Sequence, residues 1–304
     1  MAGLLLFVPV MIGFVVMLVE GAPAARWAVH LAAALLGWFV YLIAQQLPGG
    51  GAWMESRWLP IVGVGLVGST LLGADIDGVN RWHLVGPLRL HCSALLTPLL
   101  VVVAAGAVRA RPVAAGLVLT ACQLVHLAQP DAGQATALGA ATAWVLMKGT
   151  TSPVARSLGI ASAACSALVW LRPDPLPPAP FVEDIVAVAF RVAPLVGFLS
   201  LLSMIPIALA PLTIAPVHAA NANVNKARVG LALYLAGTIV VPIFGEFPVP
   251  LLGFGPSPIV GAFLGLAALE IAARRTEVVP AEHAPLPLPP RGSNGLHRFA
   301  ELRT

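Results

Sequence analysis

Long apolar runs constrain the fold of this chain more than any other feature. They recur along the sequence, separated by short breaks of Gly, Pro and charged residues. A helix of about 20 apolar residues crosses the hydrocarbon core of a bilayer, and the runs lack the alternation of barrel strands. Only 10% of the residues are charged, against about 25% in soluble domains. The sequence therefore predicts an all-α polytopic membrane protein.

Ten runs fit this description, so we expect about ten transmembrane helices. They cover approximately residues 3–19, 27–46, 58–74, 91–108, 113–128, 133–147, 156–171, 185–213, 229–244 and 256–273. The eighth run is longer than one span needs, and Pro194, Pro206 and Pro211 inside it predict kinks. From Thr276 onward the apolar pattern ends. We expect an integral membrane domain over residues 1–275 and a Pro-rich, disordered cytoplasmic tail over 276–304.

The basic residues predict how the helices are oriented. With the N-terminus in the cytoplasm, nine basic residues fall in inner loops: Arg57, Arg109, Arg111, Lys148, Arg156, Lys226, Arg228, Arg274 and Arg275. Four fall in outer loops: Arg26, Arg81, Arg89 and Arg172. This excess predicts a multi-pass protein of the cytoplasmic membrane with both termini in the cytoplasm. Because the basic residues are spread over short loops, the net charge of +4 does not indicate a nucleic-acid partner.

In this orientation, acidic residues gather on the outer side. They are Asp75, Asp77, Asp131, Asp174, Glu183, Asp184 and Glu246. Topology does not demand this, because acidic residues contribute little to orientation. A set of carboxylates on one membrane face indicates a functional site. The alternative is that short outer loops are simply polar.

Four polar motifs interrupt the apolar runs. They read GVNRWHLVGPLRLHCSALLT (78–97), QPDAG (129–133), FVEDIVA (181–187) and PVPLLGFGPS (248–257). In order and spacing they resemble the motifs of the SEDS family (shape, elongation, division and sporulation), of the FtsW/RodA/SpoVE type. The resemblance covers about residues 55–275 and implies a SEDS-like fold of ten spans with both termini cytoplasmic.

The resemblance also implies an activity. Members of this family are peptidoglycan glycosyltransferases that polymerise lipid II at the outer face of the membrane, in cell division or cell-shape maintenance, usually with a class B penicillin-binding protein. The essential acid of the family falls on Glu183 by register or on Asp184 by residue type, and the sequence leaves both open. A carboxylate at the membrane edge suits a general base for glycosyl transfer.

Further site residues follow by position in the motifs. Arg81 is expected to hold a phosphate, and Trp82 to stack on sugar. Asp131, Gly255 and Ser257 complete the expected substrate-binding set. Each has a plainer alternative: Trp82 as an interfacial anchor, Asp131 as a helix N-terminal charge, and Gly255 with Ser257 as a turn and helix cap. We expect no cofactor and no metal site in the protein, and leave a divalent cation open.

The sequence also departs from the family pattern. The glutamate and lysine that the family carries in the first motif are replaced by Ala94 and Thr97, and the long outer loop before the third motif is reduced to Arg172–Val182. Two other functions therefore stay open. One is a non-catalytic SEDS-like scaffold or regulator of a cell-wall synthesis complex, and the other is a flippase or transporter of a lipid-linked precursor.

Overall fold

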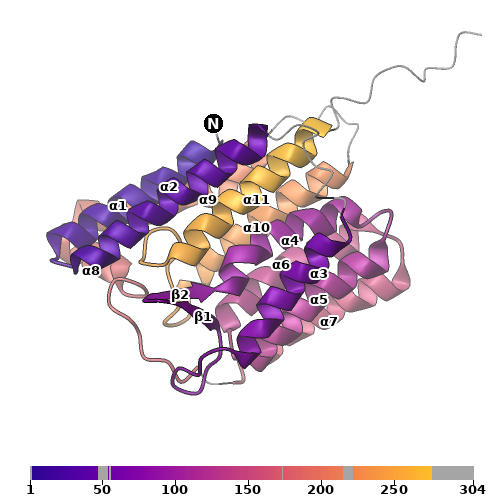
Figure 1. Cartoon of the computed structure of the whole chain (residues 1–304), viewed down its shortest axis with the longest axis horizontal. Coiled ribbons are helices and arrows are strands. Elements are labelled where there is room, and N and C mark those ends of the chain that lie inside the picture. The colour runs from indigo at the N-terminus through magenta and orange to yellow at the C-terminus, as the bar shows by residue number, and fades with distance from the viewer. Residues whose placement is uncertain (1, 47–53, 55, 173, 215–221, 276–304) are drawn as a thin grey trace, which may run out of the picture.

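The computed structural model describes residues 2–46, 54, 56–172, 174–214 and 222–275 (Figure 1). Its α-helices within these ranges are α1 Phe7–Val19, α2 Ala24–Gln46, α3 Trp58–Ser69, α4 Cys92–Ala107, α5 Pro112–Ala128, α6 Ala132–Gly149, α7 Pro153–Val169, α8 Ile185–Val192, α9 Pro194–Thr213, α10 Ala222–Val240 and α11 Pro256–Arg275. Two strands, β1 Trp82–Val85 and β2 Leu88–His91, form one antiparallel hairpin. Short 3-10 turns precede α1 (Ala2–Leu6) and extend α3 (Thr70–Leu72) and α10 (Val241–Ile243).

Each predicted apolar run overlaps at least one helix, although α10 begins before the predicted residue 229. The chain is a polytopic all-α membrane protein. In the described part of the chain, five helical segments are long and apolar enough to cross a membrane: Ala2–Val19, Ala24–Gln46, Pro194–Thr213, Ala222–Ile243 and Pro256–Arg274. Four apolar helices in the same part are shorter: Trp58–Leu72, Cys92–Ala107, Pro112–Ala128 and Pro153–Val169. The predicted tail, 276–304, lies outside the described residues.

The eighth predicted run is divided into two helices. Ala193, between α8 and α9, is extended, with φ −167° and ψ 147°. The proline ring of Pro194 disfavours a helical conformation at the residue before it, whereas Pro suits the first turn of the helix that it begins. The predicted kink at Pro194 is therefore a complete break. At Pro206 and Pro211, α9 continues without interruption.

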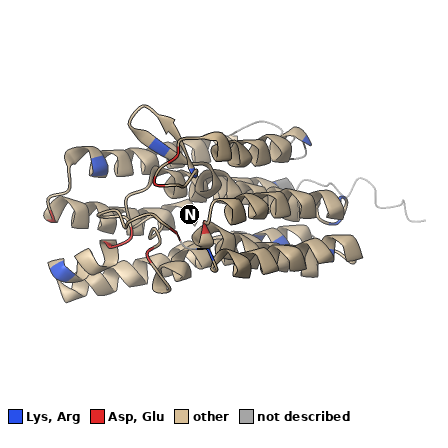
Figure 2. Ribbon diagram, turned by 90° about the horizontal axis from the view of Figure 1, so that it is seen from below, with Lys and Arg blue, Asp and Glu red and all other residues tan. Residues whose placement is uncertain are grey.

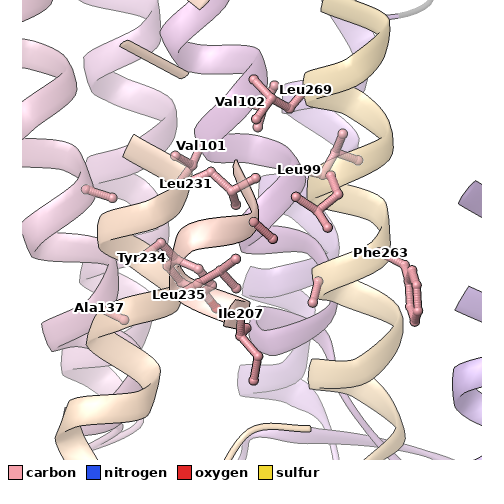
Figure 3. Packing of buried hydrophobic residues seen from close by; sticks show 14 of the residues in the cluster. Leu99, Val101, Val102, Ala137, Ile207, Leu231, Tyr234, Leu235, Phe263 and Leu269 are labelled. Atoms are coloured by element: carbon pink, nitrogen blue, oxygen red, sulfur yellow. The ribbon is translucent and has the colours of Figure 1, made fainter. Parts of the chain in front are cut away.

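The core lies where α4, α6, α10 and α11 meet. Figure 3 shows buried side chains of this core, among them Leu99, Val101, Val102, Ala137, Leu231, Tyr234, Leu235 and Leu269, together with Ile207 of α9. Phe263 projects from the other side of α11, toward Gly37 of α2. Glycines allow the helices to approach closely, as is common in membranes. A Cβ on Gly261 would lie 2.1 Å from the Ala94 carbonyl oxygen, and one on Gly237 would lie 2.7 Å from the Ala137 Cα atom.

The outward faces of several helices are apolar, as expected where lipid is the solvent. On α2 and α9 the exposed large side chains include Leu35, Leu36, Phe39, Leu195, Phe198 and Leu202. The hairpin and the loops before α8 and α11 lie together at one end of the bundle (Figure 1). Figure 2 shows most of the acidic residues in this half of the molecule, whereas basic residues occur at both ends.

Candidate functional site

The first motif forms a hairpin followed by the start of α4. Its strands pair in the register Trp82↔His91, His83↔Leu90, Leu84↔Arg89 and Val85↔Leu88. The two-residue connection is Gly86-Pro87, with Gly86 at φ +57°. A type II′ turn requires a positive φ at its first central position, which Gly provides at little cost. The polar loop expected from the sequence thus contains regular structure.

The register places four side chains on one face of the hairpin. Trp82 lies opposite His91, and Leu84 opposite Arg89. Because side chains alternate along a strand, all four project to the same side. Trp82, Arg89 and His91 line a cavity of about 450 Å³ at this end of the bundle.

The cavity brings together all four motifs. Six of the seven predicted site residues line it: Arg81, Trp82, Asp131, Glu183, Gly255 and Ser257. Asp184 is not among its lining residues. Other chemically active side chains in the lining are Arg26, Arg89, His91, Gln134, Asp174, Tyr234 and Glu246.

Arg81 is held by three partners within the protein. Its Nε donates to the Gln129 carbonyl at 3.1 Å, and its Nη2 to the Pro130 carbonyl at 2.7 Å. Its Nη1 lies 2.8 Å from Asp174 Oδ2. The side chain is only 8% exposed. The guanidinium expected to hold a phosphate therefore joins the hairpin to the second motif and to the loop before α8.

Asp131 is a helix cap and half of a buried pair. Its Oδ1 accepts the Gln134 amide at 3.0 Å at the start of α6, which agrees with its plainer alternative. Its Oδ2 lies 3.1 Å from His91 Nε2. Burial opposes ionisation of Asp131, but the charge of Arg81 and the contact with His91 outweigh it, so its pKa is lowered below the usual range. Asp131 is therefore a carboxylate at neutral pH.

His91 connects three motifs and is the residue that sequence reasoning missed. Its Nδ1 accepts the Ala94 amide at 3.2 Å, which caps α4. A neutral imidazole that accepts at Nδ1 carries its proton at Nε2, where Asp131 lies. The His91 amide donates to Ser257 Oγ at 2.9 Å, and its ring meets that of Trp82 edge to face, 5.8 Å between centroids. Its position as the first residue of the fourth predicted apolar run, 91–108, was the available signal.

Glu183 and Asp184 have different surroundings. Glu183 lines the cavity, and its Oε2 accepts the Ala179 amide at 2.7 Å. Burial raises the pKa of Glu183 above its usual range, and nearby Asp184 and Glu246 add to the rise. Asp184 instead closes a local turn, accepting the Phe181 amide at 2.6 Å. Of the two candidate acids, Glu183 is the one at the cavity.

The loop before α8 forms part of the cavity wall through residues 174–183. The Val249 amide donates to the Val182 carbonyl at 3.2 Å. A Cβ on Gly253 would lie 2.4 Å from that carbonyl oxygen, so a side chain at position 253 would separate the two segments. Arg26 Nη1 donates to the Pro180 carbonyl at 2.9 Å. Short as it is, the loop is anchored on two sides.

Within the described residues, no three His, Cys, Asp or Glu side chains are arranged to hold a metal ion.

The structure, but not the sequence, matches known proteins. No protein-family model matches the sequence, and no curated protein matches it. The structure is similar to the crystal structure of the rod shape determining protein RodA of Thermus thermophilus, at 17% sequence identity and a TM-score of 0.56, covering 90% of this chain and 96% of that chain. The chain has the fold of RodA.

A mutant of the same RodA matches equally, at 20% identity and a TM-score of 0.56, covering 90% of this chain and 97% of that chain. The resemblance to SEDS proteins is thus confirmed at the level of the fold, at a low sequence identity. On this RodA fold, the four motifs converge on one cavity.

Proposed function

We propose that this chain is a SEDS-like cell-wall protein of the cytoplasmic membrane that polymerises lipid II or a similar lipid-linked sugar at the outer face, together with a class B penicillin-binding protein. The observation that supports this is the convergence of four sequence-distant motifs on one cavity that holds a carboxylate, arginines and a tryptophan. Pockets of this kind, with a few convergent polar groups, are typical binding sites.

Glu183 takes the role of general base in this reaction. A hydroxyl oxygen of the acceptor sugar attacks the anomeric carbon of the donor, the bond from that carbon to the diphosphate oxygen breaks, and the hydroxyl proton passes to Glu183. The diphosphate leaves as an anion. The raised pKa of Glu183 makes its ionised form a stronger base than an exposed glutamate. Trp82 offers an aromatic surface for a sugar ring.

A non-catalytic scaffold is the second candidate, and one observation favours it. Arg81 and Asp131 already contact side chains of the protein, Asp174 and His91 respectively. These two contacts stabilise the hairpin whether or not a substrate binds.

The test is polymerisation of fluorescent lipid II by the purified protein with each class B penicillin-binding protein of its source organism. We expect glycan strands from the wild type and from Asp184→Asn. Glu183→Gln is expected to lose about 10²–10⁴-fold in rate, the usual contribution of a general base. Full activity of the Glu183→Gln, Asp184→Asn double variant would remove the catalytic assignment. Partner binding without any product supports the scaffold, and lipid II movement across proteoliposomes supports transport.

A further inference from the structure

Arg89 differs from the other arginines of the cavity. Arg81 uses three nitrogens within the protein, and Arg26 donates to Pro180 and lies 5.9 Å above the Phe181 ring. Arg89 is exposed and, among the described residues, makes no hydrogen bond or ion pair. Its five N–H donors are therefore available to a ligand.

The hairpin fixes where Arg89 points. Arg89 lies two residues before His91 on β2, so both project to the cavity side, as Trp82 also does. His91 is held by Asp131 and by its cap on α4. This places a cation on a supported strand of the cavity wall.

The tip of the same hairpin is apolar. Leu84 is 54% exposed and Val85 is 55% exposed. Leu84 shares the face of Arg89. Exposed apolar side chains next to an unpaired cation suit a ligand that joins a long apolar chain to an anion.

Phosphate oxygens match a guanidinium better than other common anions of membranes do, because the planar fork donates two parallel hydrogen bonds. Arg81 is the less suitable group, since binding a phosphate there would leave Asp174 without its partner. Unpairing a charge in a largely buried site is costly. Arg89 exchanges only water for the ligand.

Building on the proposed function, we propose that Arg89 binds the diphosphate of a lipid-linked sugar, with the apolar chain of that lipid lying along Leu84. Holding a phosphate, the role expected of Arg81 from the motif, thus falls to Arg89 on β2. Arg81 instead joins the segments that surround the cavity.

The experiment measures equilibrium binding of polyprenyl diphosphate, polyprenol and inorganic pyrophosphate to the full chain in nanodiscs of uncharged lipid. Wild-type protein is expected to prefer polyprenyl diphosphate over polyprenol. Arg89→Gln is expected to weaken diphosphate binding about tenfold to a hundredfold, the usual effect of losing a hydrogen bond to a charged group. Arg89→Lys retains part of the affinity, because lysine supplies charge without the fork.

Arg109→Gln is the matched control, because Arg109 is also exposed and lies beyond the opposite end of α4. Melting temperatures of both variants are expected to equal that of the wild type. Equal diphosphate affinity of Arg89→Gln and Arg109→Gln would overturn the assignment of Arg89. Equal affinity for inorganic pyrophosphate and for polyprenyl diphosphate would overturn the role of Leu84. No turnover is measured, so a wild type that binds but does not polymerise refutes only the proposed function.

Discussion

Arg81 on the hairpin and Asp174 in the loop before α8 form an ion pair, with 2.8 Å between Nη1 and Oδ2. Arg81 also holds the carbonyls of Gln129 and Pro130, so one side chain joins three segments. The Pro-rich loop is kept against the cavity by this pair and by the bond from Arg26 to Pro180.

Arg81→Gln is expected to destabilise the protein by about 2–4 kcal/mol, because it leaves two carbonyls and one carboxylate without their donor. Asp174→Asn should destabilise the protein by less, since the Asp174 side chain is 27% exposed and Arg81 keeps its carbonyl partners. The measurement is the melting temperature in detergent. A melting temperature of Arg81→Gln equal to that of the wild type would contradict this structural role.

The stability contributed by Asp131 is expected to depend on pH. Its pKa in the folded chain is lowered by Arg81 and His91, so its stabilising effect is fully present above the unfolded value of about 3.9. The effect is lost as the pH falls below that value toward the folded pKa. The melting temperature of Asp131→Asn should therefore be lower than that of the wild type at pH 7. The difference between the two melting temperatures should narrow below pH of about 4. A gap that stays constant down to pH of about 3 would show that the charge of Asp131 does not stabilise the fold.

The pH–rate profile tests Glu183 within the proposed function. A general base must be ionised, so the rate falls as the pH drops through its pKa. Because burial raises the pKa of Glu183, the acid limb of kcat/KM is expected above the ordinary glutamate value of about 4.3. Asp184→Asn should leave most of this limb in place. An acid limb at or below the ordinary value would argue against Glu183 as the base.

Much of the fold was predictable from the sequence, because each segment that crosses a membrane must be apolar and helical by itself. Each span can therefore be recognised from its own residues, without knowledge of the rest of the chain. The predicted run 91–108 corresponds to the helix Cys92–Ala107, and the predicted run 256–273 corresponds to the helix Pro256–Arg275. The hairpin was not predicted, although the alternating segments around Gly86-Pro87 are compatible with one. In so apolar a chain, a polar turn-forming stretch looks like a simple break between spans.

The contacts within the site could not be predicted from the sequence, because they depend on how the whole chain folds. Arg81 and Asp174 lie far apart in sequence, and nothing local pairs them. The sequence left Glu183 and Asp184 as equals, and the backbone turn at Phe181 gives them different neighbours. His91 was not among the predicted site residues, whereas in space it connects Asp131, Ser257 and Trp82.

His91→Phe is expected to keep an aromatic ring beside Trp82 while removing the α4 cap and the contact with Asp131. Loss of a cap costs about 1 kcal/mol. Removing the polar contact of buried Asp131 Oδ2, while Oδ1 keeps the Gln134 amide, adds about 1–3 kcal/mol. His83→Phe is the matched control. His83 lies on the other face of the hairpin and makes one bond to Ser69, at 2.8 Å. Equal melting temperatures for the two variants would show that His91 does not hold the site together.

Gly261→Ala tests the packing that positions the hairpin, because α4 starts where β2 ends. The new Cβ would lie 2.1 Å from the Ala94 carbonyl oxygen, so α11 must move away from the first turn of α4. We expect a lower melting temperature and loss of diphosphate binding, since His91 and Arg89 lie directly before that turn. Gly65→Ala is the control, because a Cβ there meets nothing within 4 Å, and alanine favours a helix over glycine by about 1 kcal/mol. If Gly261→Ala melts no lower than Gly65→Ala, the close approach of α11 and α4 is not required for the fold.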